Sequence, residues 1–265
     1  MTISTKHWDS AEHLKTEEDI QFYLEACLEE GGDDPAFIAS GPTVGDRSSP
    51  SDARAILDRY GISTPQSVDV VLAGKTGVLP DGSEQLSRVE NILVAAPSKS
   101  LEAAARCASD AGLDWQILGD DIEGEASDVA ARQASLALGM QAKLGRQDPA
   151  MVLLSGGECT VTRRGDGIGG PNAEYALALA LALDGQEGIF ALSCDTDGVD
   201  GAADVAGALI DPETLERARA LGSDPKAMLE VNDSHSFFGL LGDQVVPGPT
   251  LTNVNDFRAI LIQGL

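Results

Sequence analysis

The stretch PNAEYALALALALDGQEGIFALSCDTD, residues 171–197, decides the fold. Residues 172–183 place alanine and leucine on every side of a helix, so both of its faces should be buried. Residues 189–193 then form a short apolar run that predicts a buried strand. A buried helix that leads into a buried strand, which ends in an acidic loop, is typical of an α/β domain.

Strand and helix patterns alternate on both sides of this stretch. We expect helices over residues 9–30, 51–60, 98–111, 125–144 and 212–221, and strands over residues 91–96, 115–118, 151–154, 159–163 and 257–262. This alternation predicts a layered α/β fold with a mostly parallel sheet and flanking helices. In such folds ligands bind outside the carboxyl ends of the strands, so the loops that follow the strands are the candidate sites.

The charge balance is strongly acidic. The chain has 43 acidic and 18 basic residues, which gives a net charge of −25. A surface of this charge repels nucleic acid and anionic membranes, so we expect neither as a partner. No apolar run reaches the roughly 18 residues of a membrane span, and the four cysteines form no CxxC pair. The sequence therefore predicts a cytoplasmic protein with reduced thiols and without a structural zinc site.

Two glycine-rich loops are candidates for a ligand site. The first, LLSGGECTVT at residues 153–162, follows a predicted strand. Its paired glycines let backbone N–H groups approach a ligand, and they are equally typical of a tight hairpin. The second, RRGDGIGGPNAEYAL at residues 163–177, leads four glycines into a helix, where backbone donors favour an anion. No βαβ unit and no ribose-binding acid accompany it, so a dinucleotide fingerprint is weakly supported.

Acidic and polar residues fill two further loops. Asp195, Asp197, Asp200 and Asp204 crowd SCDTDGVDGAADVAG, residues 193–207, directly after the predicted strand. Carboxylates at this density suit Mg²⁺ with a phosphorylated ligand, or general-base work, and the alternative is a set of Asx-turns and a helix cap. The other loop comprises VNDSHSFF, residues 231–238, and GPTLTNVNDFR, residues 248–258. We interpret His235 as a packed or surface histidine rather than a general base.

These blocks together resemble the glycerate 2-kinase family, whose C-terminal portion is called MOFRL and whose members are often labelled hydroxypyruvate reductase. The matching blocks are, in order, GDDPAFIASGPTVGD, LLSGGECTVT, GGPNAEYALALALAL, DTDGVDGAADVAGAL, NDSHSFF and GPTLTNVNDFRAIL. The resemblance covers residues 32–265. Residues 5–31 instead resemble the start of addiction-module antidote proteins, and no DNA binding is carried over from them.

The resemblance implies ATP-dependent phosphorylation of D-glycerate at its 2-hydroxyl, with Mg²⁺. It implies that Asp197 orients or deprotonates this hydroxyl, and that Asp195 holds the metal or orients Asp197. Asp200 joins Asp195 as an expected metal ligand. Expected substrate or nucleotide contacts come from Ser155, Gly156, Gly157, Glu158, Gly169, Gly170, Asn172, Glu174, Thr196, Asn232, Asp233, Thr252 and Asn253. The glycines among them would leave backbone N–H groups free for phosphate oxygens.

The family pattern is incomplete in this sequence. The N-terminal part of the family carries a lysine-containing GKA-type motif that nothing here matches, and Pro171 stands where many members have arginine. We therefore expect the C-terminal part of a two-domain glycerate kinase. Its expected divisions are an appended amphipathic helical segment at residues 1–31, a partial N-terminal α/β region at residues 32–145 and a MOFRL-like domain at residues 146–265.

Three functions stay open at this point. They are a glycerate 2-kinase or a truncated remnant of one, a non-catalytic glycerate- or nucleotide-binding module, and a hydroxypyruvate reductase. The expected partner is a small hydroxy acid such as D-glycerate. A face left uncovered by the missing part of the family would also favour self-association into a homo-oligomer.

Overall fold

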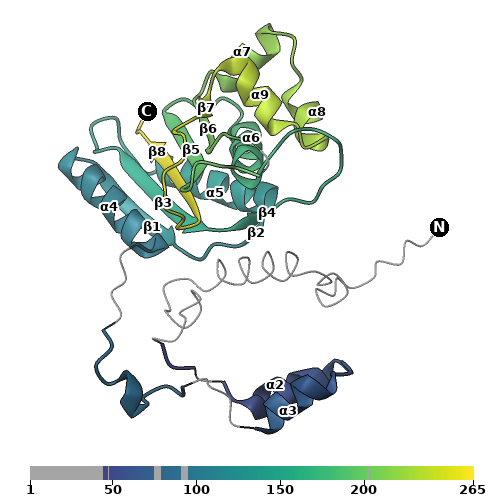
Figure 1. The fold of residues 1–265 in the computed structure, drawn as a ribbon. Coiled ribbons are helices and arrows are strands. Elements are labelled where there is room, and N and C mark those ends of the chain that lie inside the picture. The colour runs from purple at the N-terminus through teal and green to yellow at the C-terminus, as the bar shows by residue number, and fades with distance from the viewer. Residues whose placement is uncertain (1–43, 47, 75–78, 91–94, 202) are drawn as a thin grey trace. The chain divides into compact units, whose positions relative to one another are not determined.

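The computed structural model describes residues 44–46, 48–74, 79–90, 95–201 and 203–265. The chain divides into two compact units, Met1–Val94 and Ala95–Leu265 (Figure 1). The helix predicted over residues 9–30 lies outside the described residues. So does the strand predicted over residues 91–96, except for Ala95 and Ala96, which belong to no strand.

The described part of the first unit consists of short helices. They are α2 (Pro50–Arg59), α3 (Gln66–Ala73) and the 3₁₀ helix η3 (Glu84–Leu86). Ser49 caps α2 in a capping box with Asp52, because each side chain bonds the backbone N–H of the other residue. Neither α2 nor α3 buries a residue. Helix α2 confirms the helix predicted over residues 51–60.

The second unit holds a six-stranded sheet, a two-stranded sheet and six α-helices among the described residues. The helices are α4 (Pro97–Asp110), α5 (Ala126–Gln141), α6 (Pro171–Leu183), α7 (Thr214–Ala220), α8 (Pro225–Glu230) and α9 (Ser234–Leu241). The strands of the large sheet are β1 (Asp114–Gly119), β3 (Met151–Gly157), β5 (Ile189–Asp195), β6 (Gly207–Ile210), β7 (Gln244–Val245) and β8 (Asp256–Ile262). The small sheet pairs β2 (Gly124–Glu125) with β4 (Cys159–Thr160).

The order of the large sheet is β1-β3-β8-β5-β6-β7. Strands β1, β3, β5 and β7 run in one direction, and β8 and β6 run in the other. The α/β fold with flanking helices is confirmed. Four of the six strands of the large sheet run in one direction, which agrees with the predicted mostly parallel sheet; among its neighbouring strands, β1 and β3 pair in parallel and the other described pairs are antiparallel. The reason is that β8, the last strand, lies antiparallel between β3 and β5.

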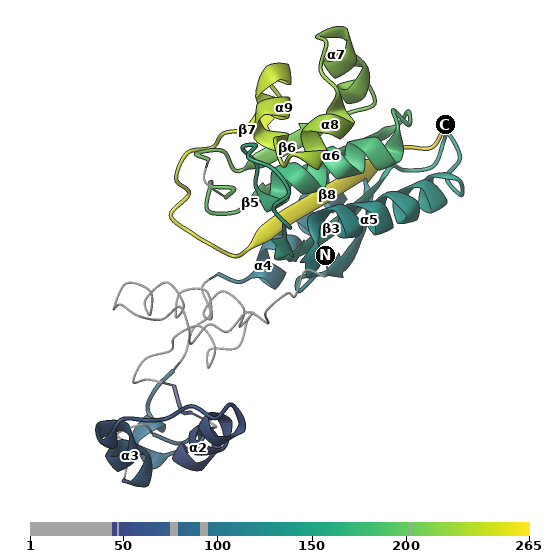
Figure 2. The same ribbon diagram turned by 90° about the vertical axis from the view of Figure 1, so that its right-hand side faces the viewer.

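Two layers of helices cover the sheet. Helices α5 and α6 pack side by side on one face (Figure 2). Their core includes Tyr175 and Leu177 of α6 and Ile260 and Ile262 of β8, each no more than 1% exposed. Burial alternates along β8, so its even-numbered residues face this core. Helix α4 covers β1 and β3 on the opposite face.

An apolar groove continues on the α4 face, over the strands that α4 leaves open. It is a cavity of about 490 Å³, and its lining includes Val152, Phe190, Leu192, Leu209 and Leu261. Phe190 is 38% exposed and Leu209 is 49% exposed. The sheet therefore presents large apolar side chains to solvent on this side.

The observed division differs from the predicted boundary between residues 145 and 146. Strand β1 pairs with β3, and α5 packs against α6, so residues 95–145 belong to the same compact unit as residues 146–265. No helix in the described part of the chain has both the length and the apolar character to cross a membrane.

Candidate active site

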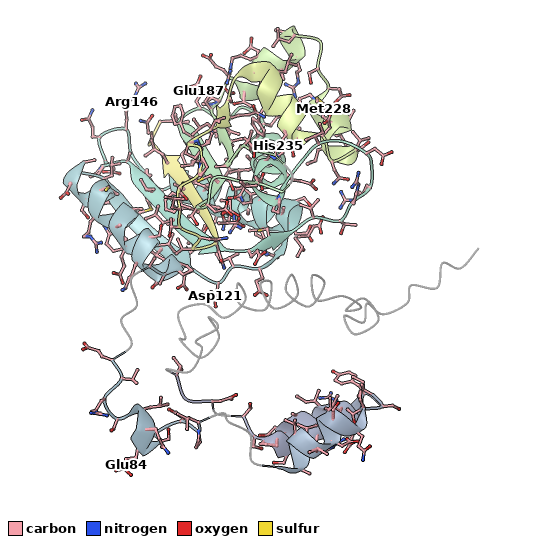
Figure 3. All side chains as sticks on the ribbon, viewed as in Figure 1. Glu84, Asp121, Arg146, Glu187, Met228 and His235 are labelled. Carbon is pink, nitrogen blue, oxygen red and sulfur yellow. The ribbon has the colours of Figure 1, made fainter. Side chains whose placement is uncertain are left out.

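The candidate site lies at the end of the large sheet where β3 and β5 finish and β8 begins. Strand pairing places Gly157, Asp256 and Asp195 in one row, with Asp256 opposite both of the others. Directly opposed residues of antiparallel strands project from the same face, so Asp195 and Asp256 share the face covered by α6. In Figure 3, Asp121 lies at this end of the sheet and Glu187 lies at the other.

A buried ion pair forms the floor of the site. Arg258 is 1% exposed and donates to the carboxylate of Asp256. It also donates to the carbonyl of Gly156 at 3.2 Å and to Sγ of Cys159 at 3.0 Å. Burial raises the pKa of Asp256, and the charge of Arg258 offsets this only in part. Neither residue was predicted as a site residue. Their period-two spacing puts both on one face of β8, which begins one residue before the strand predicted over residues 257–262.

Asn172, in the first turn of α6, links the Asp256–Arg258 ion pair to β5. Its Nδ2 donates to Oδ1 of Asp256 at 2.6 Å. Its Oδ1 accepts the hydroxyl hydrogen of Ser193 at 2.7 Å. Asn172 is 1% exposed, and both ends of its amide are used. The structure thus gives Asn172 a contact inside the protein where the sequence predicted a contact with substrate or nucleotide.

Asp200 caps α6 from a separate loop. Its carboxylate accepts the backbone N–H groups of Asn172 at 3.0 Å and Ala173 at 2.9 Å. Nε2 of His235 lies 3.2 Å from Oδ2 of the same carboxylate. Asp200 is 1% exposed, and a Cβ on Gly170 would lie 2.5 Å from its oxygens. The carboxylate faces the helix and His235, which favours the helix-cap interpretation over the predicted metal ligand.

His235 is 3% exposed, as expected for a packed histidine. Burial lowers its pKa, but the hydrogen bond and the charge of Asp200 outweigh burial, so the pKa is raised overall.

Asp195 and Asp197 form the acidic pair at the mouth of the site. Oδ1 of Asp195 accepts the backbone N–H of Asp197 at 3.0 Å. Burial raises the pKa of Asp195 to about 7, and the charges of Asp197 and Asp256 add to this rise against the lowering effect of that N–H. Oδ1 of Asp197 accepts the N–H of Val199 at 2.7 Å. Both carboxyl groups are partly exposed, so they remain open to a ligand.

The C-terminal polar loop closes over this pair. Nδ2 of Asn253 lies 3.4 Å from Oδ2 of Asp197. The hydroxyl of Thr196 donates to the carbonyl of Asn255 at 2.8 Å and accepts the N–H of Val254 at 2.8 Å. The structure therefore brings Thr196, Asp197 and Asn253 together, and Thr252 lies exposed in the same loop as Asn253.

The glycine loop of residues 165–170 packs against protein. The N–H of Gly167 donates to the carbonyl of Val231 at 3.0 Å, and the N–H of Ile168 donates to Asp233 at 2.9 Å. A Cβ on Gly165 would lie 2.6 Å from Val231, and other glycines of this loop show similar close contacts. Gly165, Gly167 and Gly169 are needed because a Cβ there would meet backbone atoms of residues 231–233, and a Cβ on Gly170 would meet the carboxylate of Asp200. That the N–H groups of Gly169 and Gly170 bind phosphate stays a prediction.

The paired glycines of β3 have the same explanation. Gly157 has a φ of +104°, and a Cβ there would lie 2.2 Å from the backbone nitrogen of Ile122. The carbonyl of Gly156 accepts the N–H of Ile122 at 3.2 Å. Glu158, which follows, is exposed. The loop after β1 therefore crosses directly over this glycine pair.

Three further predicted contacts lie inside the protein. Ser155 is 2% exposed and bonds Gln133, while Glu174 is fully buried. Oε2 of Glu174 accepts from Nδ2 of Asn232 at 2.9 Å, and Oδ1 of Asn232 accepts the N–H of Arg164 at 2.6 Å. Burial raises the pKa of Glu174. Glu174 and Asn232 therefore hold the start of the glycine loop in place.

The donor set limits the metal that the site can take. Among residues 44–265, leaving out the gaps given above, no three His, Cys, Asp or Glu side chains are grouped to hold a metal ion. The thiols do not add a ligand, because burial raises the pKa of both Cys159 and Cys194 to about 11. The partly exposed carboxylates of Asp195 and Asp197 remain, and Mg²⁺ usually takes one or two carboxylates together with substrate phosphates.

Comparison with protein families matches two parts of the chain. The MOFRL family matches residues 151–256, and a domain of unknown function, DUF4147, matches residues 31–73. The first of these ranges contains most of the site described above.

Curated relatives carry two kinds of name. A protein of Agrobacterium vitis named "Putative hydroxypyruvate reductase" is 51% identical over 87% of this chain and 52% of its own length. The D-glycerate 2-kinase of Thermotoga maritima is 37% identical over 87% of this chain and 54% of its own length. The chain spans about half the length of these relatives.

Two comparisons cover more than two thirds of the relative. The glycerate kinase of Macaca fascicularis is 31% identical over 88% of this chain and 70% of its own length. The crystal structure of the glycerate kinase of Thermotoga maritima superposes with a TM-score of 0.79 and 31% identity, over 93% of this chain and 68% of that one. By sequence and by fold, the chain therefore belongs to the glycerate kinase family.

Proposed function

We propose that this chain is a glycerate 2-kinase, which transfers a phosphoryl group from ATP to the 2-hydroxyl of D-glycerate. The observation that supports it best is the acidic pair Asp195 and Asp197 at the carboxyl end of β5, in a chain whose relatives are named glycerate kinases. Carboxylates at this position are suited to orienting a hydroxyl and to holding a metal beside it.

Asp197 is the residue that we assign to the substrate hydroxyl. The N–H of Val199 and the amide of Asn253 hold its carboxylate on two sides, while the group stays partly exposed. A carboxylate fixed in this way accepts the hydroxyl hydrogen bond in one orientation, and orientation accounts for much of the catalysis of phosphoryl transfer. Thr252 and Asn253 lie exposed in the loop that contacts Asp197, and they are the proposed substrate contacts.

Asp195 supports Asp197 and is the proposed metal ligand. It accepts the N–H of Asp197, so a bound ion would meet two carboxylates, one at the end of β5 and one two residues later in the following loop. Bound ATP with Mg²⁺ would supply the phosphoryl group and neutralise the charge that develops on it. Asp200 has no part in this proposal, because its oxygens already cap α6.

We further propose that the protein works in the cytoplasm and associates with itself through the apolar groove. The exposed Phe190 and Leu209 support self-association, since exposed apolar surface of this kind marks an interaction site. The acidic surface, with a net charge of −25, supports a small-molecule substrate over nucleic acid.

Product analysis tests the kinase proposal. Mass spectrometry should detect phosphoglycerate when the purified chain is incubated with ATP, Mg²⁺ and D-glycerate. Asp197→Asn should lower kcat at least about 100-fold, because it removes the acceptor of the hydroxyl proton. Asp166→Asn is the matched control, since the side chain of Asp166 is fully exposed, and its activity should equal that of the wild type.

Two outcomes would contradict the proposal. Turnover of NADH with hydroxypyruvate, in the absence of phosphoglycerate, would favour the reductase. The arrangement of residues 165–170 speaks against that alternative, because the backbone N–H groups of Gly167 and Ile168 are already bonded within the protein. No turnover, combined with a thermal shift on adding D-glycerate or Mg-ATP, would identify a non-catalytic binding module.

A further inference from the structure

We propose that Asp256 is a positioning residue of this site, which ties the first turn of α6 and the ends of β3 and β5 together and thereby fixes the loop that carries Asp195 and Asp197. The kinetic part of this inference rests on the proposed kinase function, and the positional part does not.

Asp256 is placed at the crossing point of the site. It is the first residue of β8, and it lies opposite Gly157 on one side and Asp195 on the other. Because β8 lies between β3 and β5 in the described sheet, it is the strand that joins these two strands. A displacement of Asp256 would therefore move both strand ends.

The carboxylate of Asp256 is bonded by three different segments. Nδ2 of Asn172 donates to Oδ1 from α6, and the backbone N–H of Cys159 donates to Oδ2 from β4 at 3.2 Å. Arg258 donates to Oδ2 from β8 itself. A carboxylate accepts several hydrogen bonds at once, so a single side chain joins a helix and two strands here.

A series of hydrogen bonds links Asp256 to the acidic pair Asp195 and Asp197. Asn172 also accepts the hydroxyl hydrogen of Ser193, two residues before Asp195 on β5. The N–H of Asp197 then donates to Asp195, and the N–H of Val199 donates to Asp197. The loop from Asp195 to Val199 is therefore held by successive Asx-type hydrogen bonds. It begins at the end of β5, which Asp256 holds in place.

Asp256 itself does not meet a ligand. It is 5% exposed, and both of its oxygens are already bonded within the protein. Its role must be exerted through its neighbours, which is what distinguishes it from Asp195 and Asp197.

The test compares three variants of the full chain. Asp256→Asn keeps the shape and removes the charge that balances Arg258. Asn172→Ala leaves the Asp256–Arg258 pair intact and removes the side-chain bonds of Asn172 to Asp256 and Ser193, with a long one to Asp200 at 3.5 Å, so it keeps the proposal testable if the first variant fails to fold. Asp243→Asn is the control, because Asp243, which precedes β7, loses its ion pair with Arg217 of α7, a partly exposed pair outside the site.

Hydrogen exchange of backbone amides gives the positional readout. In Asp256→Asn and Asn172→Ala, the amides of Asp197 and Val199 should exchange at least about tenfold faster than in the wild type, because their acceptors lose their fixed geometry. In the control variant both rates should equal the wild-type rates. Unchanged exchange of these two amides in a folded Asn172→Ala variant would overturn the inference, whether or not the chain is a kinase.

Kinetics give the second readout. The two site variants should lower kcat about tenfold or more, with KM for D-glycerate and Mg-ATP changed less than about threefold, since misplacement of a catalytic group acts on the transition state. An equal loss in Asp243→Asn would overturn the inference by showing a general effect of lost stability. Absence of turnover in the wild type would instead contradict the kinase proposal, and hydrogen exchange would then decide the positioning role alone.

Discussion

Replacing Asp200 with asparagine should destabilise the second unit by about 3 kcal/mol. The carboxylate accepts the N–H groups of Asn172 and Ala173 in the buried first turn of α6, and it pairs with His235. Asparagine keeps the shape but offers one acceptor oxygen, so one buried N–H is left without a partner at a cost of about 1–3 kcal/mol. The lost charge next to His235 accounts for about 1 kcal/mol more.

The size of this effect should depend on pH. The pKa of His235 is raised in the folded protein from its ordinary value of 6.5. Its stabilising interaction is therefore fully present below pH 6.5 and is lost as the pH rises through the folded-state value. The difference between wild type and Asp200→Asn should consequently be larger at about pH 6 than at about pH 9.

Urea unfolding followed by circular dichroism measures both effects. At this domain size a loss of about 3 kcal/mol also lowers the melting temperature by about 6–12 °C. Asp224→Asn is the matched control, because Asp224 caps α8 through the N–H groups of Lys226 and Ala227 at an exposed position. It should cost less than about 1 kcal/mol. Equal losses in the two variants would refute the view that burial makes the Asp200 cap important.

Four further substitutions or reactions check other parts of the structure. Gly157→Ala should destabilise the protein by more than about 3 kcal/mol in the same urea assay, since its φ is +104° and its Cβ would clash with backbone. Gly139→Ala should instead stabilise it by up to about 1 kcal/mol, because that position lies in α5 with open space around it. Iodoacetamide at about pH 8 should label the exposed Cys107 well before the two thiols whose pKa is about 11, as read by peptide mass spectrometry; equal labelling would contradict their burial. Leu209→Ser should reduce binding of a fluorescent apolar dye with little change in stability, and undiminished dye binding would show that the groove is not the exposed apolar surface.

The local elements could be predicted from the sequence, but their pairing could not. The apolar run at residues 189–193 became β5, and the alanine–leucine stretch became α6, because burial on all sides leaves a clear composition signal. The position of β8 between β3 and β5 has no such signal, since periodicity identifies a strand without naming its neighbours.

The candidate site was predicted in part for a related reason. Asp195, Asp197 and Asn253 were identified as polar loop residues and lie together at one strand end. The role of the glycines stays a prediction, because a glycine that frees an N–H for a ligand and one that lets backbones touch look alike in sequence. Arg258 was missed because a charged residue within a predicted strand gives no sign that it is buried against an acid.

The position of β8 between β3 and β5 also affects how the chain folds during its synthesis. Met151 pairs with Ile262, so the centre of the sheet joins segments that leave the ribosome far apart in time. Until the last strand emerges, β3 and β5 have no shared neighbour, and the buried face of α6 has an incomplete surface to pack on. Contacts of such long sequence separation fold slowly, and the growing chain would expose two unpaired strand edges meanwhile. The arrangement therefore leaves these two edges unpaired, and the site incomplete, until β8 has been synthesised.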